Sequence, residues 1–339
     1  MAIKRINNIQ CLRAFAAIAV ICFHLVAAAR IYNNPVVTED FFLRLGSSGV
    51  DVFFVISGFI MVHTQVNRRR TASDFFVNRL IRIVPVYWTL SLAIGAMLLI
   101  KPEVFGSQSF SADRVFSSLT FTSISFSSQP PLIFIGWTIE LEMTFYALFA
   151  LSLMVKKIST SVLFASVGIL FLVFVCNFST ILIEFIFGML IGLFVRDKRV
   201  SRSWNWTALV LAGAGFAISA VFDLASVERV IKWGIPAFLL VFGVIGINQL
   251  RKSFLVEIGN ASYSIYLVQV FVIPATYKIV GRMDLNQFAE VWAVMCLALT
   301  IGAGLVVYRL VEFPITNRLQ KWWTVSQRQK IPTNKKLVM

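Results

Sequence analysis

The feature that most constrains this chain is its first long apolar run, which extends from Ile9 to Ala29. At about 1.5 Å per helical residue, such a run crosses a hydrocarbon core of about 30 Å. The run also contains Arg13 and His24. An ionisable side chain inside a span costs roughly 2.5–3.5 kcal/mol on insertion scales, so two of them need buried partners or a water-filled cavity. This helix therefore predicts a functional site inside a membrane protein.

The composition agrees with an integral membrane protein. Only 14% of the residues are charged and the mean hydropathy is +0.81, whereas a soluble domain has about 25% charged residues. The net charge of +15 does not indicate a nucleic-acid-binding protein, because the basic residues fall between apolar runs. Cys11, Cys22, Cys176 and Cys296 show no paired spacing, which indicates neither a disulfide framework nor a metal site.

Nine further apolar runs predict an all-α polytopic membrane protein with about ten transmembrane helices. They lie near residues 48–66, 84–100, 133–154, 159–176, 179–195, 205–222, 231–249, 258–279 and 288–310. The stretch from Ser107 to Pro131 is rich in Ser, Thr and Phe without being continuously apolar. We expect it to form a long external loop that dips back toward the membrane.

The distribution of Lys and Arg predicts the orientation. One set of alternating loops holds more than twice as many of them as the other, in clusters near residues 4–5, 68–82, 156–157, 196–202, 251–252 and 318–336. The poorer set contains Arg30, Arg44, Lys101, Arg114, Arg229, Lys232, Lys278 and Arg282. By the positive-inside rule, both termini are cytoplasmic. We expect a membrane domain over 1–320 and a basic cytoplasmic tail over 321–339.

The first run has a second interpretation. Lys4 and Arg5 precede it and Ala27 to Ala29 end it, a pattern that a cleaved signal peptide also shows. Removing it would leave the orientation of the other spans unchanged, so the charge pattern leaves both interpretations open.

The orientation also predicts depth. Arg13 lies near the cytoplasmic side, and His24 lies about 16 Å higher on the same helix. Asp51 begins the second span on the outer side, and His63 ends it on the inner side. Glu142 lies in the outer half of the fourth span. His24, Asp51 and Glu142 therefore share an outer layer, in which a carboxylate can orient the imidazole as a general base toward a hydroxyl group. A satisfied core histidine, an interfacial His63 and a solvated Asp51 are the alternatives.

Arg79 and Arg82 are the candidates for binding phosphate. They stand at i and i+3, on one helical face, and such a pair can hold phosphates by forked hydrogen bonds. Pro85 is expected to restart the chain at the membrane. The alternative is simple anchoring by positive charge at the cytoplasmic side.

Three carboxylates lie within later spans. Glu140 and Glu142 stand at i and i+2, so they point about 200° apart and one of them faces the interior. Glu184 is a further intramembrane acid without an obvious partner.

Other residues have ordinary structural explanations. Ser57 and Gly58 suit helix packing through small residues. Trp137 lies near a span end, as an interfacial anchor does. Glu312 begins an EFP segment at which the tenth span is expected to end.

Taken in order, six segments resemble the acyltransferase 3 family of membrane acyltransferases, over roughly residues 6–320. They are Arg13-x10-His24, GVDVFFVISGF at 49–59, RLIRIVP at 79–85, WTIELEMTFY at 137–146, ASYSIYL at 261–267 and EFP at 312–314. The second and fourth segments look most like the branch that acetylates bacterial exopolysaccharide and O-antigen.

The resemblance implies an enzyme of the bacterial inner membrane. It would move an acetyl group from acetyl-CoA to a hydroxyl of a surface polysaccharide or its lipid-linked precursor, with no tightly bound cofactor and no nucleic-acid partner. The essential histidine and arginine of the family map onto His24 and Arg13, its arginine pair onto Arg79 and Arg82, and its glutamate onto Glu142.

The expected site has three parts. The catalytic candidates are His24, Glu142 and Asp51, and the candidates for binding the donor are Arg13, Arg79, Arg82 and His63. Ser57, Trp137, Tyr146, Tyr266 and Glu312 are candidates for substrate contact or structural support. Many relatives have histidine where this chain has Gln269, so a proton-carrying role there is not expected. The alternative function is a proton-coupled transporter of small molecules or lipids, based on the intramembrane charges alone.

Overall fold

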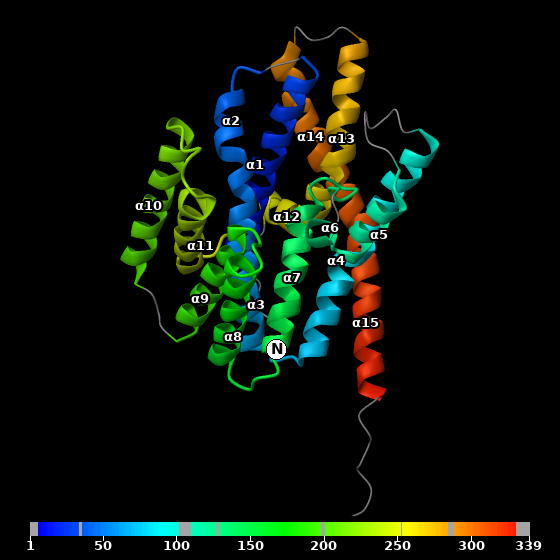
Figure 1. Cartoon of the computed structure of the whole chain (residues 1–339). Helices are drawn as coiled ribbons and strands as arrows, with labels where there is room; N and C mark the ends of the chain where they lie inside the picture. Colours follow the sequence, from blue (N-terminus) through cyan, green and yellow to red (C-terminus); the bar gives the residue numbers. More distant parts are fainter. Residues whose placement is uncertain are drawn as a thin grey trace, which may run out of the picture.

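The computed structural model describes residues 6–33, 36–101, 110–126, 129–197, 201–251, 253–283 and 288–329. Within these ranges every regular element is a helix, which confirms the predicted all-α class. The elements are α1 (Asn7–Ile31), α2 (Glu39–Leu45), η1 (Gly46–Ser48), α3 (Gly49–Asn67), α4 (Ala72–Ile100), α5 (Ala112–Thr120), α6 (Ser123–Phe126), α7 (Gly136–Ser152), α8 (Ile158–Phe174), η3 (Thr180–Leu182), α9 (Ile183–Asp197), α10 (Arg202–Val221), η4 (Val230–Gly234), α11 (Ile235–Gly246), α12 (Phe254–Asn260), α13 (Ser262–Arg282), α14 (Ala289–Val307), η6 (Tyr308–Glu312) and α15 (Phe313–Gln329) (Figure 1).

Within the described residues, six helical stretches are long and apolar enough to cross a membrane by length and composition. They are Asn7–Ile31, Glu39–Asn67, Ala72–Ile100, Arg202–Val221, Ser262–Arg282 and Ala289–Gln327. All ten predicted runs are helical, but some form shorter helices. The 17 residues of α8 rise only about 25 Å, less than the hydrocarbon core. The count of ten spans stays a prediction.

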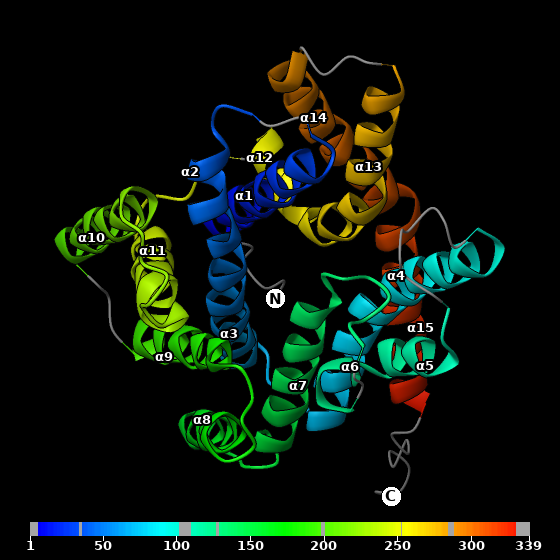
Figure 2. The same cartoon turned by 45° about the horizontal axis from the view of Figure 1, so that its top comes forward.

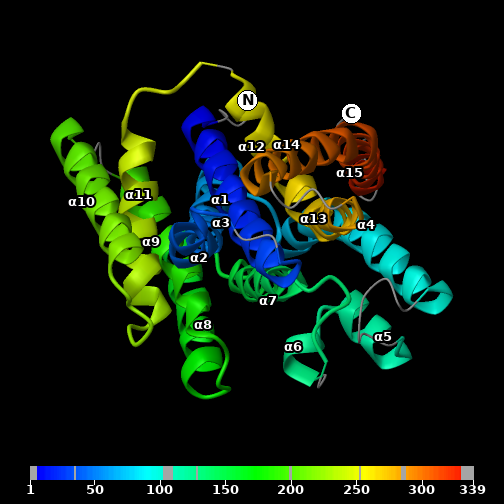
Figure 3. The ribbon, with the colours of Figure 1, turned by 90° about the horizontal axis from the view of Figure 1, so that it is seen from above.

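The helices α1, α3 and α7 lie between two flanking groups. Helices α8 to α11 lie on one side of them, and α4, α5, α13 and α15 lie on the other (Figures 2 and 3). The start of the C-terminal part, α12 and α13, packs against α1 although the sequence separates them widely. Residues from both ends of the chain therefore meet in the centre of the molecule.

Helices α3 and α9 pack with their backbones close together. A Cβ atom on Gly188 of α9 would lie 2.6 Å from the backbone nitrogen of Phe59 and 2.9 Å from the Cα of Gly58. Glycine at both positions permits this approach, which confirms the prediction of small-residue packing at Gly58.

The prediction that the chain restarts at Pro85 is wrong. Helix α4 begins at Ala72 and continues through Pro85. Thr71 caps its start, where the Thr71 side chain accepts a hydrogen bond of 3.1 Å from the amide of Asp74. Arg79 and Arg82 consequently belong to a continuous helix that enters the protein interior, and not to a loop.

The helical backbone also does not end at the EFP segment. A π-helical turn, η6, connects α14 to α15, and Pro314 follows directly inside α15. The wider turn accommodates a proline that cannot donate an intrahelical hydrogen bond. Helix α15 crosses residue 320, and the indole of Trp323 donates a hydrogen bond of 3.2 Å to Asp74. The tail over 330–339 lies outside the described residues.

The Ser-rich stretch before α7 folds back onto the helices. The guanidinium of Arg114 on α5 donates hydrogen bonds of 2.8 Å and 3.2 Å to the carbonyl oxygens of Pro130 and Pro131. The amide of Ile124 on α6 donates one of 2.9 Å to Oε2 of Glu140. Residues 107–109 and 127–128 of this predicted loop lie outside the described residues.

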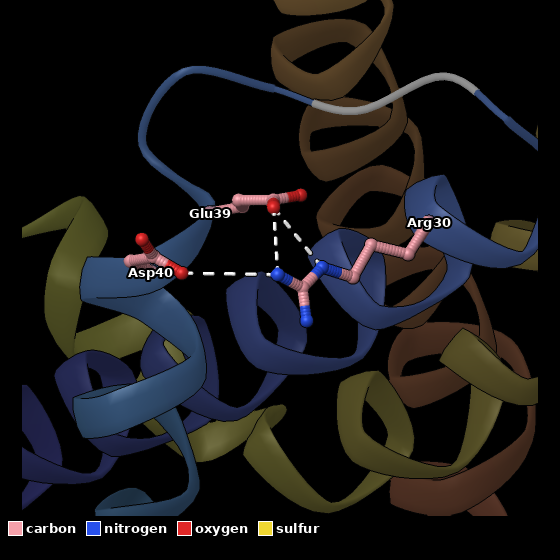
Figure 4. A network of polar contacts seen from close by, with 3 residues as sticks. All are labelled: Arg30, Glu39 and Asp40. Atoms are coloured by element: carbon pink, nitrogen blue, oxygen red, sulfur yellow. Dashed lines mark hydrogen bonds and ion pairs between the residues drawn. The ribbon is translucent and has the colours of Figure 1, made fainter. Parts of the chain in front are cut away.

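An ion-pair group joins the end of α1 to the start of α2. Arg30 donates hydrogen bonds of 2.8 Å and 3.0 Å to Oε1 of Glu39, and Asp40 lies 3.8 Å from the same guanidinium (Figure 4). This turn lies at the top of Figure 1, like the end of α13 and the start of α14. The end of α3, the start of α4 and the end of α15 lie at the bottom. The helices thus alternate in direction as expected, and which end is cytoplasmic stays a prediction.

Candidate active site

A cavity of about 90 Å³ lies among α1, α3, α4, α7 and α13. Its lining includes seven of the residues expected at the site: Arg13, Ser57, Arg79, Arg82, Glu142, Tyr146 and Tyr266.

Helix α3 presents one face to the cavity. Val50, Phe53, Phe54 and Ser57 line it, with the i, i+3, i+4, i+7 spacing of a single helical face. Asp51 lies on a different face and is not among the lining residues. This helical geometry separates Asp51 from Ser57, although the same motif contains both.

Glu142 connects two walls of the cavity. The hydroxyl of Ser57 on α3 donates a hydrogen bond of 2.8 Å to its Oε1, and the hydroxyl of Tyr146 donates to the same oxygen. Glu140 faces the opposite side, where it accepts the Ile124 amide. The prediction that Glu140 and Glu142 lie in different surroundings is confirmed.

Three arginines, Arg13, Arg79 and Arg82, line the cavity together with this carboxylate. Arg13 donates a hydrogen bond of 2.9 Å to the hydroxyl of Ser262 and lies within electrostatic reach of Arg82, Glu142 and Glu312. The guanidinium carbon of Arg79 lies 5.6 Å from the ring centroids of both Phe75 and Tyr146.

The cavity carries more positive than negative charge. The Nε of Arg79 is buried and has no hydrogen-bond partner in the part of the chain that the structure describes. Among the described residues that line the cavity, Glu142 is the one carboxylate beside Arg13, Arg79 and Arg82, and Glu312 lies nearby. Such a site is suited to an anionic group that offers several acceptor oxygens.

Residues of α13 and the turn before α7 close the rest of the cavity. The hydroxyl of Tyr266 lies 2.9 Å from that of Thr138 and 3.3 Å from the carbonyl oxygen of Ile135. Tyr263 donates a hydrogen bond of 2.8 Å to the carbonyl oxygen of Ile83 on α4. Sequence reasoning selected Tyr266 but missed Tyr263 and Ser262, which follow from the same helical spacing in the ASYSIYL segment.

Two supporting residues lie behind the wall. Glu312 is 5% exposed and accepts a hydrogen bond of 2.5 Å from Ser264. Trp137 packs against the apolar core that contains Ile139 and Phe145. Neither residue lines the cavity.

His24 lies beside the cavity and not in its lining. Its ring is held edge-on by Phe23 and Phe134, each with a centroid separation of 5.1 Å. Among the described residues, neither Asp51 nor Glu142 forms a hydrogen bond with the His24 ring. Phe134 directly precedes Ile135, whose carbonyl oxygen contacts Tyr266 of the cavity wall. Phe134 thus connects the His24 ring to the segment that contacts Tyr266.

Asp51 has a different partner from the one expected. Arg229 binds both of its oxygens, with Nε to Oδ1 at 3.0 Å and Nη2 to Oδ2 at 2.7 Å. Glu184 of α9 lies against the same carboxylate. No sequence spacing links Asp51 to Arg229, so the pair could not be predicted; the need of a buried acid for a basic partner was the only signal.

His63 lies at the far end of α3. Its ring stacks on Phe59 with centroids 5.4 Å apart, and Nδ2 of Asn67 lies 3.2 Å from its Nε2. It is not among the cavity-lining residues, and its part in donor binding stays a prediction.

Comparison with known proteins identifies the family. The family model described as "Acyltransferase domain", Acyl_transf_3, matches residues 6–308. The chain is 33% identical over 294 residues to the exopolysaccharide production protein ExoZ of Rhizobium meliloti, covering 81% of this chain and 90% of the relative. It is 24% identical to the acyltransferase MdmB of Streptomyces mycarofaciens, covering 92% of each chain.

A third relative has a longer chain. The O-acetyltransferase OatA of Staphylococcus aureus is 25% identical over 360 residues, which cover 91% of this chain and 56% of the relative. No solved structure matches the chain. The family match over residues 6–308, with the helical fold, establishes that the chain belongs to the acyltransferase 3 family of multi-pass membrane acyltransferases.

Proposed function

We propose that this enzyme transfers an acetyl group from acetyl-CoA to a hydroxyl group of a surface polysaccharide or its lipid-linked precursor, in the bacterial inner membrane. Two relatives support the class of acceptor and of acyl group: one is named for exopolysaccharide production and another is an O-acetyltransferase.

The observation that carries the donor assignment is the excess of guanidinium groups in the cavity. Coenzyme A is anionic at its phosphates, and Arg79 has a buried Nε without a partner among the described residues. Arg79 and Arg82 bind the phosphates in this proposal. In this proposal the pantetheine arm enters the cavity, which Arg79 and Arg82 line, and the adenine remains outside.

Arg13 and His24 lie at the two ends of the proposed path of the acyl donor. They lie on the same helix, about 16 Å apart along its axis. Arg13 contacts the donor, and His24 acts where the thioester meets the acceptor. Because neither carboxylate touches the imidazole, Glu142 acts by holding Ser57 and Tyr146 and by offsetting the arginine charge.

The acetyl group can reach the sugar hydroxyl by either of two routes. In direct transfer, His24 removes the proton of the sugar hydroxyl, the oxygen attacks the thioester carbonyl, the C–S bond breaks and the CoA thiolate takes up the proton. In the relay route, a His24 nitrogen attacks the thioester carbonyl, the C–S bond breaks, and the CoA thiolate leaves with the proton of the other ring nitrogen. The sugar hydroxyl then attacks the acetyl-imidazole, the C–N bond breaks, and the hydroxyl proton returns to the imidazole.

The test is transfer of labelled acetyl from acetyl-CoA to isolated surface polysaccharide by purified enzyme in detergent. We expect the label to be linked to the polysaccharide by an ester that mild base cleaves. We expect this transfer in the absence of a membrane potential, whereas a proton-coupled transporter would need one. Equal acetyl content in the surface glycans of cells with and without the enzyme would overturn the proposal.

A further inference from the structure

Three charged side chains meet where α3, α9 and η4 join, on the other side of α3 from the cavity. Asp51 of α3 and Glu184 of α9 are both 0% exposed. The side chain of Arg229, which directly precedes η4, is 29% exposed. The group therefore contains two buried acids and one base.

Arg229 is fully engaged with the first acid. Its forked contacts occupy both oxygens of Asp51 at 3.0 Å and 2.7 Å, and its Nη2 also donates a hydrogen bond of 3.0 Å to the carbonyl oxygen of Ser47. Its guanidinium carbon lies 4.7 Å from the ring centroid of Trp233. One cation thus balances one carboxylate and leaves the second uncompensated.

Glu184 is that second carboxylate. Both of its oxygens are buried and, as an ionised group, neither has a hydrogen-bond partner among the described residues. Its carboxyl lies within hydrogen-bonding contact of Asp51. Two ionised carboxylates cannot hydrogen-bond because neither has a donor, and an unpaired buried charge costs several kcal/mol. A single proton on Glu184 removes both problems.

The turn η4 lies close to the Glu184 carboxyl. A Cβ atom on Gly234 of η4 would lie 3.0 Å from Oε1 and 3.2 Å from Cγ of Glu184, so the η4 backbone is packed directly against the carboxyl. No group of three or more His, Cys, Asp and Glu residues that could hold a metal occurs in the part of the chain that was searched.

We propose that Asp51, Glu184 and Arg229 form a buried proton-binding site, in which Glu184 holds one proton and donates a hydrogen bond to an ionised Asp51. Among the described residues, Lys232 is a further cation near this group, and its Nζ lies 4.4 Å from the centroid of the Trp233 ring. The hydrogen bond through this proton links α9 to α3, and the Arg229 ion pair links α3 to the segment between α10 and α11. This assignment does not depend on the acyl donor or acceptor.

The first test is infrared spectroscopy of the purified protein at neutral pH. The carbonyl stretch of a protonated carboxylic acid should be present in the spectrum of wild type. The wild-type spectrum minus that of Glu184→Gln should show this band, because the variant has lost it, whereas Glu184→Asp should retain it. Glu228→Gln is the matched control, because Glu228 is exposed beside the same arginine. An unchanged band in Glu184→Gln overturns the proposal.

Thermal unfolding against pH gives an independent measurement. The folded state holds a proton that the unfolded carboxyl releases near its ordinary pKa of about 4.3. Raising the pH therefore lowers stability, by up to about tenfold in the unfolding equilibrium for each pH unit. The melting temperature of wild type should fall more steeply with pH than that of Glu184→Gln. Parallel curves would contradict a bound proton.

Discussion

The hydroxyl group of Ser57 on α3 donates a hydrogen bond of 2.8 Å to Oε1 of Glu142 on α7. The contact joins two segments that the sequence separates by 85 positions, and Tyr146 donates to the same oxygen. One carboxylate thereby fixes the spacing of two cavity walls next to three arginines.

Replacing Ser57 tests this connection. Ser57→Ala removes a hydrogen bond to a charged group, so we expect a loss of about 1.5–3 kcal/mol in the free energy of unfolding. Thermal unfolding of purified protein measures it. Ser226→Ala, at an exposed position, is the control, and equal melting temperatures of the two variants would show that the contact contributes no stability.

The donor site makes a prediction about coenzyme A affinity. Arg79→Gln and Arg82→Gln each remove charge-assisted hydrogen bonds worth about 1.5–3 kcal/mol, so binding should weaken roughly 10–150-fold. Arg68→Gln is the control, because Arg68 is exposed between α3 and α4. Titration calorimetry with coenzyme A measures the affinities. If both interior variants bind like the control, the phosphates are held elsewhere.

His24 should be required for the chemical step. Losing a general base costs on the order of 10²–10⁴ in rate, so His24→Ala should nearly abolish glycan acetylation while coenzyme A still binds. Cys22→Ala, two residues away on α1, controls for packing. Near-normal acetylation by His24→Ala would exclude the histidine from catalysis. Labelled acetyl-CoA without acceptor separates the two routes, because only the relay route leaves acetyl on His24.

The helical architecture could be predicted because its cause is local. In an apolar run of about 20 residues, a helix pairs the backbone N–H and C=O groups with one another, which is the main way to satisfy them in lipid. This local rule does not predict a helix that continues from the lipid into a polar protein interior. Arg79 and Arg82 resemble a loop in composition, yet they continue α4, and their side chains line the cavity.

The candidate site could be predicted only in part, for a similar reason. The predicted depth in the membrane placed Asp51 near His24, but this depth does not determine the direction in which a helix face points. Asp51 faces η4, and its partner Arg229 stands 178 positions away in the sequence. Glu184 could not be given a partner before α3 and α9 were known to pack together. Pairing of buried charges is a tertiary property, and only the residue types are visible in the sequence.

The close contact of α3 and α9 should be sensitive to a single methyl group. Gly188→Ala would place a Cβ atom against the backbone of Phe59 and Gly58, and such overpacking costs about 1–3 kcal/mol. Gly213→Ala is the matched control, because its Cβ would meet nothing within 4 Å and alanine favours a helix by up to about 1 kcal/mol. The melting temperature should fall for Gly188→Ala alone. An equal response of both variants would show that the two helices can separate without cost.

The orientation of the molecule can be tested by labelling single cysteines in cells. Arg69 lies between α3 and α4, and Met283 directly follows α13. In Figure 1 the end of α3 and the end of α13 lie at opposite ends of the helices. With Cys11, Cys22, Cys176 and Cys296 replaced by serine or alanine, Arg69→Cys should react with a membrane-impermeant thiol reagent only after the cells are opened. Met283→Cys should react in intact cells, because the loops rich in Lys and Arg remain in the cytoplasm. The reverse pattern would place the arginine side of the cavity outside the cell, away from cytoplasmic acetyl-CoA, and would rule out the proposed path of the donor.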